Sequence, residues 1–160
     1  MKYINSKFLI EKVSVQNIAQ KCGTPAYCYS YSLLKNNIKK FKNSFKSFSP
    51  LICFAIKSNT NLNLIKEIKK FGLGADVVSI GELMLAIKAG IKPEKIVFSG
   101  VGKTSEEIKY AINKGVFLIN AESKSEIEEI ERIAKLKKRK IEIGIRLNPN
   151  TDAKTLSKIS

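Results

Sequence analysis

The chain has 160 residues, of which 44% are apolar, so it can bury one hydrophobic core and only marginally two. No apolar run approaches the ~18 residues that span a bilayer, and the first residues lack the uninterrupted apolar segment of a signal peptide. Three cysteines without metal-ligand spacing, and no histidine, argue against a metal site. We therefore expect a reduced, cytoplasmic protein without a membrane partner.

The net charge of +15 raises the question of a nucleic-acid partner. Only three of the 29 basic residues are arginines, and the lysines are scattered along predicted helix faces. Recognition of bases and phosphates favours arginine forks with interleaved aromatic side chains, and neither pattern is present. The densest basic run, KLKKRK at 135–140, falls at the end of a predicted helix, where cations complement the helix dipole. The composition therefore favours a solvated basic surface over a nucleic-acid site.

The first 50 residues differ from the rest, and we expect them to form a leading segment beside the first strand of the second part. TPAYCYS at 24–30 is a strand-like run. The following YSLLKNNIKKFKNSF, at 31–45, has apolar residues at helical spacing and predicts an amphipathic helix. We therefore divide the chain into a segment at 1–50 and a domain at 51–160.

From residue 51 on, apolar strand-like runs alternate with amphipathic helices at intervals of about 21 to 24 residues. Such alternation with short connections is typical of parallel sheets and barrels. A complete (β/α)8 barrel needs ~250 residues, so we expect an α/β fold with a partial barrel of about five βα units. The expected strands are LICFAI (51–56), GADVV (74–78), KIVFS (95–99), VFLIN (116–120) and IEIGIRL (141–147).

Three predicted helices begin with a capping box, in which a hydroxyl and a carboxylate three residues later satisfy free backbone N–H groups. The pattern occurs at Ser79–Glu82, Thr104–Glu107 and Ser123–Glu126. Glu82 is therefore interpreted as part of a cap rather than as a catalytic acid.

The run FSGVGKT at 98–104 resembles half of a phosphate-binding P-loop. That motif needs a glycine five positions before Gly102, and Val97 stands there instead. We interpret Thr104 as the N-cap of the following helix, with Gly100 and Gly102 allowing the tight turn before it.

Polar residues follow each predicted strand. In parallel α/β folds, ligands bind beyond the carboxyl ends of the strands, so these residues are expected to gather at one rim. Two interpretations remain open, a functional site or the ordinary polarity of loops. The residues are Lys57–Ser58–Asn59, Asp76, Ser99–Gly100, Asn120 and Arg146–Asn148.

Three of these residues have side chains suited to chemistry. Lys57 directly follows an apolar run, and a lysine that loses hydration there would offer a neutral amine, a nucleophile toward an aldehyde; the alternative is a solvated loop lysine. Asp76 either ends a strand or faces inward, where it would need a cation such as Lys57. Arg146 either bridges a surface carboxylate or takes an inward or rim position, which its apolar neighbours favour.

Six segments follow one another along the chain: TPAYCYS, CFAIKSN, GLGADVVSIGEL, KIVFSGVGKT, INAES and IRLNPNTDAKT. Together they resemble the diaminopimelate decarboxylases, in the alanine-racemase-like, fold-type III group of pyridoxal-phosphate (PLP) enzymes. The resemblance runs from about residue 23 to residue 160 and is closer than that to ornithine or arginine decarboxylases or to alanine racemase.

The resemblance implies PLP as the cofactor and gives three residues a role. Lys57 matches the lysine that holds PLP as a Schiff base, Asp76 matches a carboxylate beside the cofactor, and Arg146 matches a barrel arginine near it. The implied reaction is the decarboxylation of meso-diaminopimelate, a small amino acid, to L-lysine and CO₂ in lysine biosynthesis. The implied assembly is a homodimer.

Other features of the family are not found in the sequence. A histidine that stacks on the PLP ring, a glycine-rich phosphate loop, an acidic partner for the pyridinium nitrogen and a catalytic cysteine come from later parts of these enzymes. The sequence is therefore expected to represent the N-terminal part, without the last barrel strands and the β domain, and to be inactive alone.

Several alternatives to this activity remain open. They are a truncated, non-catalytic remnant of such an enzyme and a related PLP-dependent decarboxylase of basic amino acids. A small PLP-binding homeostasis protein is disfavoured because it needs its whole barrel, and a basic nucleic-acid binder is disfavoured by composition.

Overall fold

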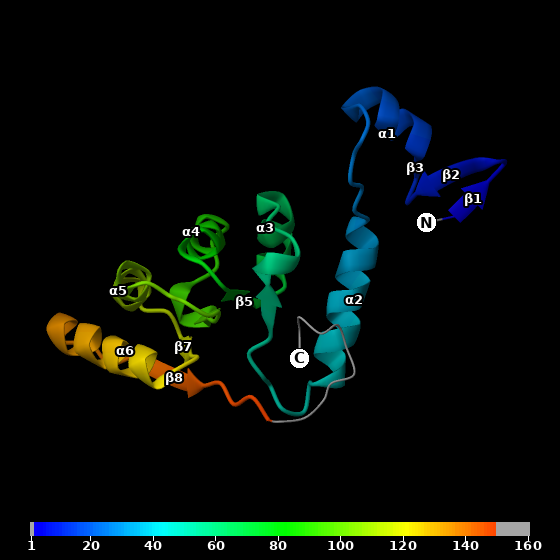
Figure 1. Cartoon of the computed structure of the whole chain (residues 1–160). Helices are drawn as coiled ribbons and strands as arrows, with labels where there is room; N and C mark the ends of the chain where they lie inside the picture. Colours follow the sequence, from blue (N-terminus) through cyan, green and yellow to red (C-terminus); the bar gives the residue numbers. More distant parts are fainter. Residues whose placement is uncertain (1, 150–160) are drawn as a thin grey trace. The chain divides into compact units, whose positions relative to one another are not determined.

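The computed structural model describes residues 2–149. The chain separates into two compact units, Met1–Pro50 and Leu51–Ser160 (Figure 1).

The first unit consists of a three-stranded antiparallel sheet, in the order β1-β2-β3, and two helices. The carboxylate of Glu11 accepts hydrogen bonds from Ser30 Oγ at 2.8 Å and from the backbone N–H of Ser32 at 2.7 Å. It thereby ties the sheet hairpin to the start of α2. The elements are β1 (Lys2–Ile4), β2 (Lys7–Ile10), β3 (Val13–Ser14), α1 (Val15–Cys22) and α2 (Tyr31–Ser44).

The predicted helix at 31–45 is therefore confirmed, but the strand predicted at 24–30 is wrong. The backbone there has no regular structure, and Tyr27 is 93% exposed. Apolar side chains alone do not make a strand, because an extended segment also needs a neighbouring strand for its N–H and C=O groups.

The second unit contains a five-stranded parallel sheet in the order β4-β5-β6-β7-β8, so each strand lies beside its predecessor in the sequence. All five predicted strands and the predicted α/β fold are present. The elements are β4 (Cys53–Ala55), η1 (Ile56–Ser58), α3 (Leu62–Lys70), β5 (Gly74–Val77), α4 (Ile80–Lys88), η2 (Pro93–Lys95), β6 (Ile96–Phe98), α5 (Ser105–Lys114), β7 (Leu118–Ala121), α6 (Lys124–Lys137) and β8 (Glu142–Ile145).

The sheet of the second unit has one face that its helices bury and one that they leave half-bare. Side chains of a strand alternate between faces, and burial alternates accordingly along β5, β6 and β7. Ala75, Val77, Phe98 and Ile119 join the core formed with the helices, which follow one another around the strands in Figure 1. Asp76 and the residues paired with it in β4 and β6 lie on the other face and are only partly buried, so we call this the half-bare face.

The capping boxes fix where the helices begin, with one change from the predicted geometry. Thr104 and Glu107 exchange both bonds of the box. In the other two boxes the serine caps its helix as predicted, but the glutamate accepts from the residue before the cap: Glu82 from the N–H of Val78 at 2.9 Å, and Glu126 from that of Glu122 at 2.7 Å. The interpretation of Glu82 as a capping residue is confirmed.

Candidate functional site

Three polar side chains at the carboxyl ends of three neighbouring strands form one hydrogen-bonded chain on the half-bare face. Asn120 Nδ2 donates to Ser99 Oγ at 2.9 Å, and Ser99 Oγ donates to Asp76 Oδ1 at 2.6 Å. Strand register explains the arrangement: Asp76 pairs with Val97, so Ser99 lies two residues further along on the same face. The strand ends therefore gather as predicted, and these three residues are joined.

The carboxamide of Asn120 lies over a glycine of the next strand. Asn120 is paired with Gly144 in the β7–β8 ladder. A Cβ atom on Gly144 would overlap Asn120 Oδ1, so the absence of a side chain there makes room for the carboxamide. Gly144 is thus part of the geometry of the site, which the sequence patterns did not predict.

Lys57 lies in the single turn of 3-10 helix that follows β4, and its side chain is exposed. Within residues 2–149, no hydrogen bond or ion pair engages its amine. The expected pairing with Asp76 is not present, because the chain leaves the extended conformation at Ile56 and Asp76 bonds to Ser99 instead. The expected loss of hydration is also not seen: β4 is an edge strand of its sheet, and the described part of the unit does not enclose the lysine.

Arg146 directly follows β8 and lies beside Glu122, which follows β7. Its Nη1 atom is 3.3 Å from Glu122 Oε2, and its Nε donates to Asn148 at 3.2 Å. The Glu122 side chain is only 10% exposed, whereas that of Arg146 is 55% exposed. Arg146 therefore lies at the rim, and the carboxylate that it bridges is largely buried rather than at the surface.

A buried ion pair joins the turn between β6 and α5 to the first turn of α6, and the sequence patterns did not predict it. Lys103 Nζ is 3.0 Å from Glu126 Oε1, and the two side chains are 1% and 8% exposed. Lys103 also donates to the backbone carbonyls of Gly100, at 2.5 Å, and Asn120, at 2.8 Å. The FSGVGKT run that contains Lys103 was the available signal, but it was tested only as a P-loop.

Cys53 lies at the start of β4, on the same face of the sheet as Asp76. Its thiol points toward the carbonyl oxygen of Lys95, 3.8 Å away. Burial, and secondarily the negative charge of Asp76, raise the pKa of the Cys53 thiol. The cysteine is therefore held in its neutral form and is no candidate nucleophile.

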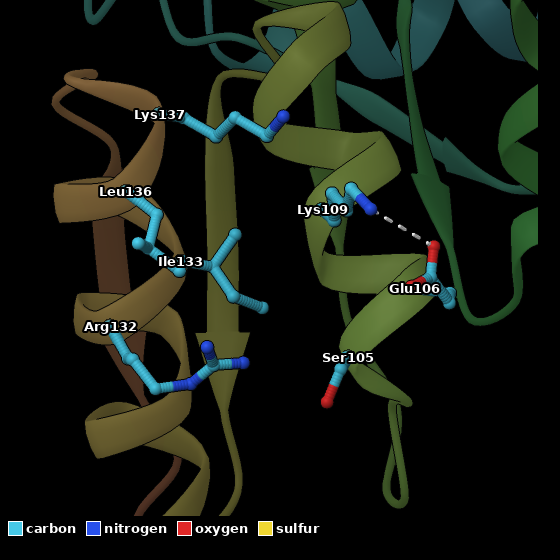
Figure 2. A pocket seen from close by; sticks show the side chains of 7 residues that line it. All are labelled: Ser105, Glu106, Lys109, Arg132, Ile133, Leu136 and Lys137. Atoms are coloured by element: carbon cyan, nitrogen blue, oxygen red, sulfur yellow. Dashed lines mark ion pairs between the residues drawn. The ribbon is translucent and has the colours of Figure 1, made fainter.

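A separate groove runs between α5 and α6 and holds several basic residues (Figure 2). Lys109 pairs with Glu106 of its own helix at 3.6 Å, and Arg132 pairs with Glu129 of its own helix at 2.7 Å. Lys109 and Arg132 therefore form their ion pairs within their own helices. The groove is lined by Ser105, Glu106, Lys109, Arg132, Ile133, Leu136 and Lys137.

Within residues 2–149 there is no helix with the length and apolar character needed to cross a membrane. The same residues contain no cluster of three side chains suited to binding a metal ion.

Comparison with known proteins decides the family. A model of the pyridoxal-dependent decarboxylase, pyridoxal binding domain, matches residues 32–160. The chain belongs to this family of pyridoxal-binding domains. The expected partial barrel is thereby confirmed, since the five parallel strands are those of such a domain.

Relatives of this pyridoxal-binding domain carry the name that the six segments indicated. The chain is 42% identical over 155 residues to diaminopimelate decarboxylase of Aquifex aeolicus, covering 97% of the chain and 36% of the relative. It is 46% identical over 145 residues to that of Helicobacter pylori, covering 91% and 36%. A crystal structure of the H. pylori enzyme complexed with L-lysine matches with a TM-score of 0.85 at 43% identity, over 89% of this chain and 36% of that one. The resemblance is confirmed, and the chain spans a little over a third of its relatives.

Proposed function

We propose that this chain holds PLP through Lys57 and serves the decarboxylation of meso-diaminopimelate to L-lysine and CO₂. Support comes from the family of the pyridoxal-binding domain and from relatives named diaminopimelate decarboxylase at 42% and 46% identity. The segment CFAIKSN, which resembles the cofactor-binding segment of those enzymes, places Lys57 at the carboxyl end of β4.

The groups at the strand ends fit this cofactor. An aldehyde needs a primary amine, and the amine of Lys57 is exposed and unengaged within residues 2–149. A nearby carboxylate stabilises a protonated nitrogen of the cofactor by charge. Asp76 could supply it, since it lies on the half-bare face in β5, the strand next to β4. Bound at this rim, PLP would supply the electron sink that accepts the electron pair left when CO₂ departs.

The chain's own residues would bind and orient. Lys57 would hold the cofactor through Nζ, and Asp76, oriented by its bond from Ser99, would offer a negative charge beside it. Arg146 would place a guanidinium at the rim, oriented by Glu122 and Asn148. The free amine of Lys57 carries this proposal.

Borohydride trapping tests the cofactor site. The chain is incubated with PLP, reduced, digested and mapped by mass spectrometry. We expect the reduced adduct on Lys57, its loss in Lys57→Ala, and its retention in Lys66→Ala, a matched control that removes an exposed lysine of α3. An adduct that persists in Lys57→Ala, or label spread evenly over surface lysines, would refute the assignment.

Release of CO₂ tests the activity separately. Chain loaded with PLP is given meso-diaminopimelate, and the gas is measured, with ornithine and arginine as competing substrates. Release from meso-diaminopimelate alone supports the proposed reaction. Trapping at Lys57 without any release agrees with the expectation that this chain is inactive alone, and release from ornithine or arginine supports a related decarboxylase.

The assembly, the partners and the cellular compartment of the chain are proposed from its family and composition. We propose a homodimer, no nucleic-acid partner, and the cytoplasm, where the free thiols of Cys22, Cys28 and Cys53 would stay reduced. Sedimentation measures the first. A DNA affinity that falls steeply with salt would contradict the second.

A further inference from the structure

We propose that the Lys103–Glu126 ion pair is a positioning device for the candidate site. It holds the ends of β6 and β7 so that Ser99 and Asn120 keep their hydrogen bonds to each other and to Asp76. The relevance of this role to catalysis rests on the proposed function, but the geometry does not.

Lys103 contacts both strand ends at once. Its ammonium group donates to the carbonyl of Gly100, the residue after Ser99, and to the carbonyl of Asn120 itself. The same ammonium group forms an ion pair with the Glu126 carboxylate at 3.0 Å. The side chain lies against the ring of Phe98, with 5.7 Å from Nζ to the ring centre. One buried cation therefore fixes the backbone on either side of the Asn120–Ser99 bond.

Glu126 extends the same device to the other polar pair. Among the described residues its buried Oε1 atom makes no hydrogen bond and pairs by charge with the Lys103 ammonium, while Oε2 accepts from the backbone N–H of Glu122. The same carboxylate therefore holds the backbone of Glu122, whose side chain pairs with Arg146.

The helices do not need this pair in order to begin. The backbone N–H of Glu126 is capped by Ser123, and α5 has its own box at Thr104. A buried ion pair is costly to desolvate, and an apolar replacement is often no less stable. Removing a pair that serves position should therefore increase the mobility of the strand ends strongly and lower the melting temperature only slightly.

Proton exchange of the Asn120 carboxamide, measured by NMR without PLP, is the readout. The test variant is Lys103→Met with Glu126→Gln, which removes both charges and keeps side-chain size. The matched control is Lys109→Met with Glu106→Gln, which removes an exposed ion pair of α5. Loss of one hydrogen bond predicts Asn120 exchange about tenfold faster in the test variant, with wild-type exchange in the control.

A charge-reversed variant, Lys103→Glu with Glu126→Lys, separates position from simple charge attraction. It restores opposite charges but turns a carboxylate toward the carbonyls of Gly100 and Asn120, so we expect no recovery of slow exchange. Recovery would overturn the proposal, as would wild-type exchange in the uncharged variant.

A milder change decides if those variants do not fold. Glu126→Gln removes the anion that holds the Lys103 ammonium against the two carbonyls, so we expect exchange at Asn120 to rise several-fold in a folded chain. Unchanged exchange in that variant overturns the proposal. Borohydride trapping at Lys57 in wild-type chain is measured in parallel, so a failure of the proposed cofactor site is distinguished from a failure of the positioning pair.

Discussion

Ser99 Oγ donates a 2.6 Å hydrogen bond to Asp76 Oδ1, which joins β5 and β6 through side chains beyond their backbone ladder. The same hydroxyl accepts from Asn120. Removing it would leave one donor and one acceptor without a partner in a partly buried place.

Ser99→Ala is therefore expected to lower the free energy of unfolding by about 1–3 kcal/mol, the cost of leaving such groups unsatisfied. Urea unfolding measures it. The matched control is Ser58→Ala, whose hydroxyl donates to Ala55 at an exposed position and should cost ~0.5 kcal/mol or less. Equal losses in the two variants would contradict the importance given to the Ser99 bond.

Two glycines in strands should respond differently to alanine. A Cβ at Gly74 would overlap the backbone carbonyl of Lys95, which cannot move away, whereas at Gly144 it would meet the side chain of Asn120, which can rotate. We expect Gly74→Ala to cost more than about 3 kcal/mol and Gly144→Ala about 1–2 kcal/mol. Thermal unfolding ranks them.

Gly81→Ala provides the control for the glycine series. Gly81 lies in α4, where a Cβ meets only Ser79 Oγ at 3.8 Å. Alanine there should be neutral or stabilising by up to about 1 kcal/mol. A loss at Gly81 as large as that at Gly74 would show that close approach of the backbone is not the cause.

The carboxyl group of Glu107 makes the stability of the fold depend on pH. Hydrogen bonds from the backbone N–H groups of Thr104 and Ile80 lower the pKa of its carboxyl, that from Thr104 being the larger cause. Because the folded-state pKa is lower than the unfolded one, the carboxylate stabilises the fold above pH ~4.5, and this contribution is lost as pH falls through the folded-state value.

Glu107→Gln should therefore destabilise the chain at pH 7, by about 1 kcal/mol as for other helix caps, and the difference from wild type should shrink toward pH 3. Urea unfolding at the two pH values measures it. Glu106→Gln, at an 80% exposed neighbour, should show no such trend. A difference independent of pH would contradict the assignment.

Thiol reactivity reports on the half-bare face. The thiolate is the reactive form, and the pKa of Cys53 is raised by burial and by Asp76. We expect Cys53 to react with iodoacetamide at least about tenfold more slowly than exposed Cys22. Asp76→Asn should speed the reaction of Cys53 without changing that of Cys22, and equal rates in folded wild-type chain would contradict the raised pKa.

The strands and helix caps could be predicted because their signals are local. Ser79, Thr104 and Ser123 cap their helices through residues only three positions away. The failed strand at 24–30 shows the limit of that approach, since pairing depends on a partner that the local sequence does not contain.

The contacts of the site could be predicted only in part, because register decides them. Lys57 was the expected partner of Asp76, but the 3-10 turn that begins at Ile56 takes Lys57 out of the strand direction. Ser99, which directly follows β6, bonds to Asp76 instead. Lys103 escaped notice because a lysine in a glycine-rich turn suggests a ligand, whereas its partners are the chain's own carbonyls and Glu126.

The sequential strand order has a consequence for how the second unit loosens. Among the described strands of this unit, each pairs only with its predecessor and successor, so β4 and β8 each have a single neighbour. Such an arrangement resembles a stack of repeats, in which opening spreads from the ends. Backbone amides should therefore lose hydrogen-exchange protection first in β4 and β8 and last in β6. Lys57, which follows β4, would then sample open states in which Asp76, Ser99 and Asn120 are still hydrogen-bonded to one another.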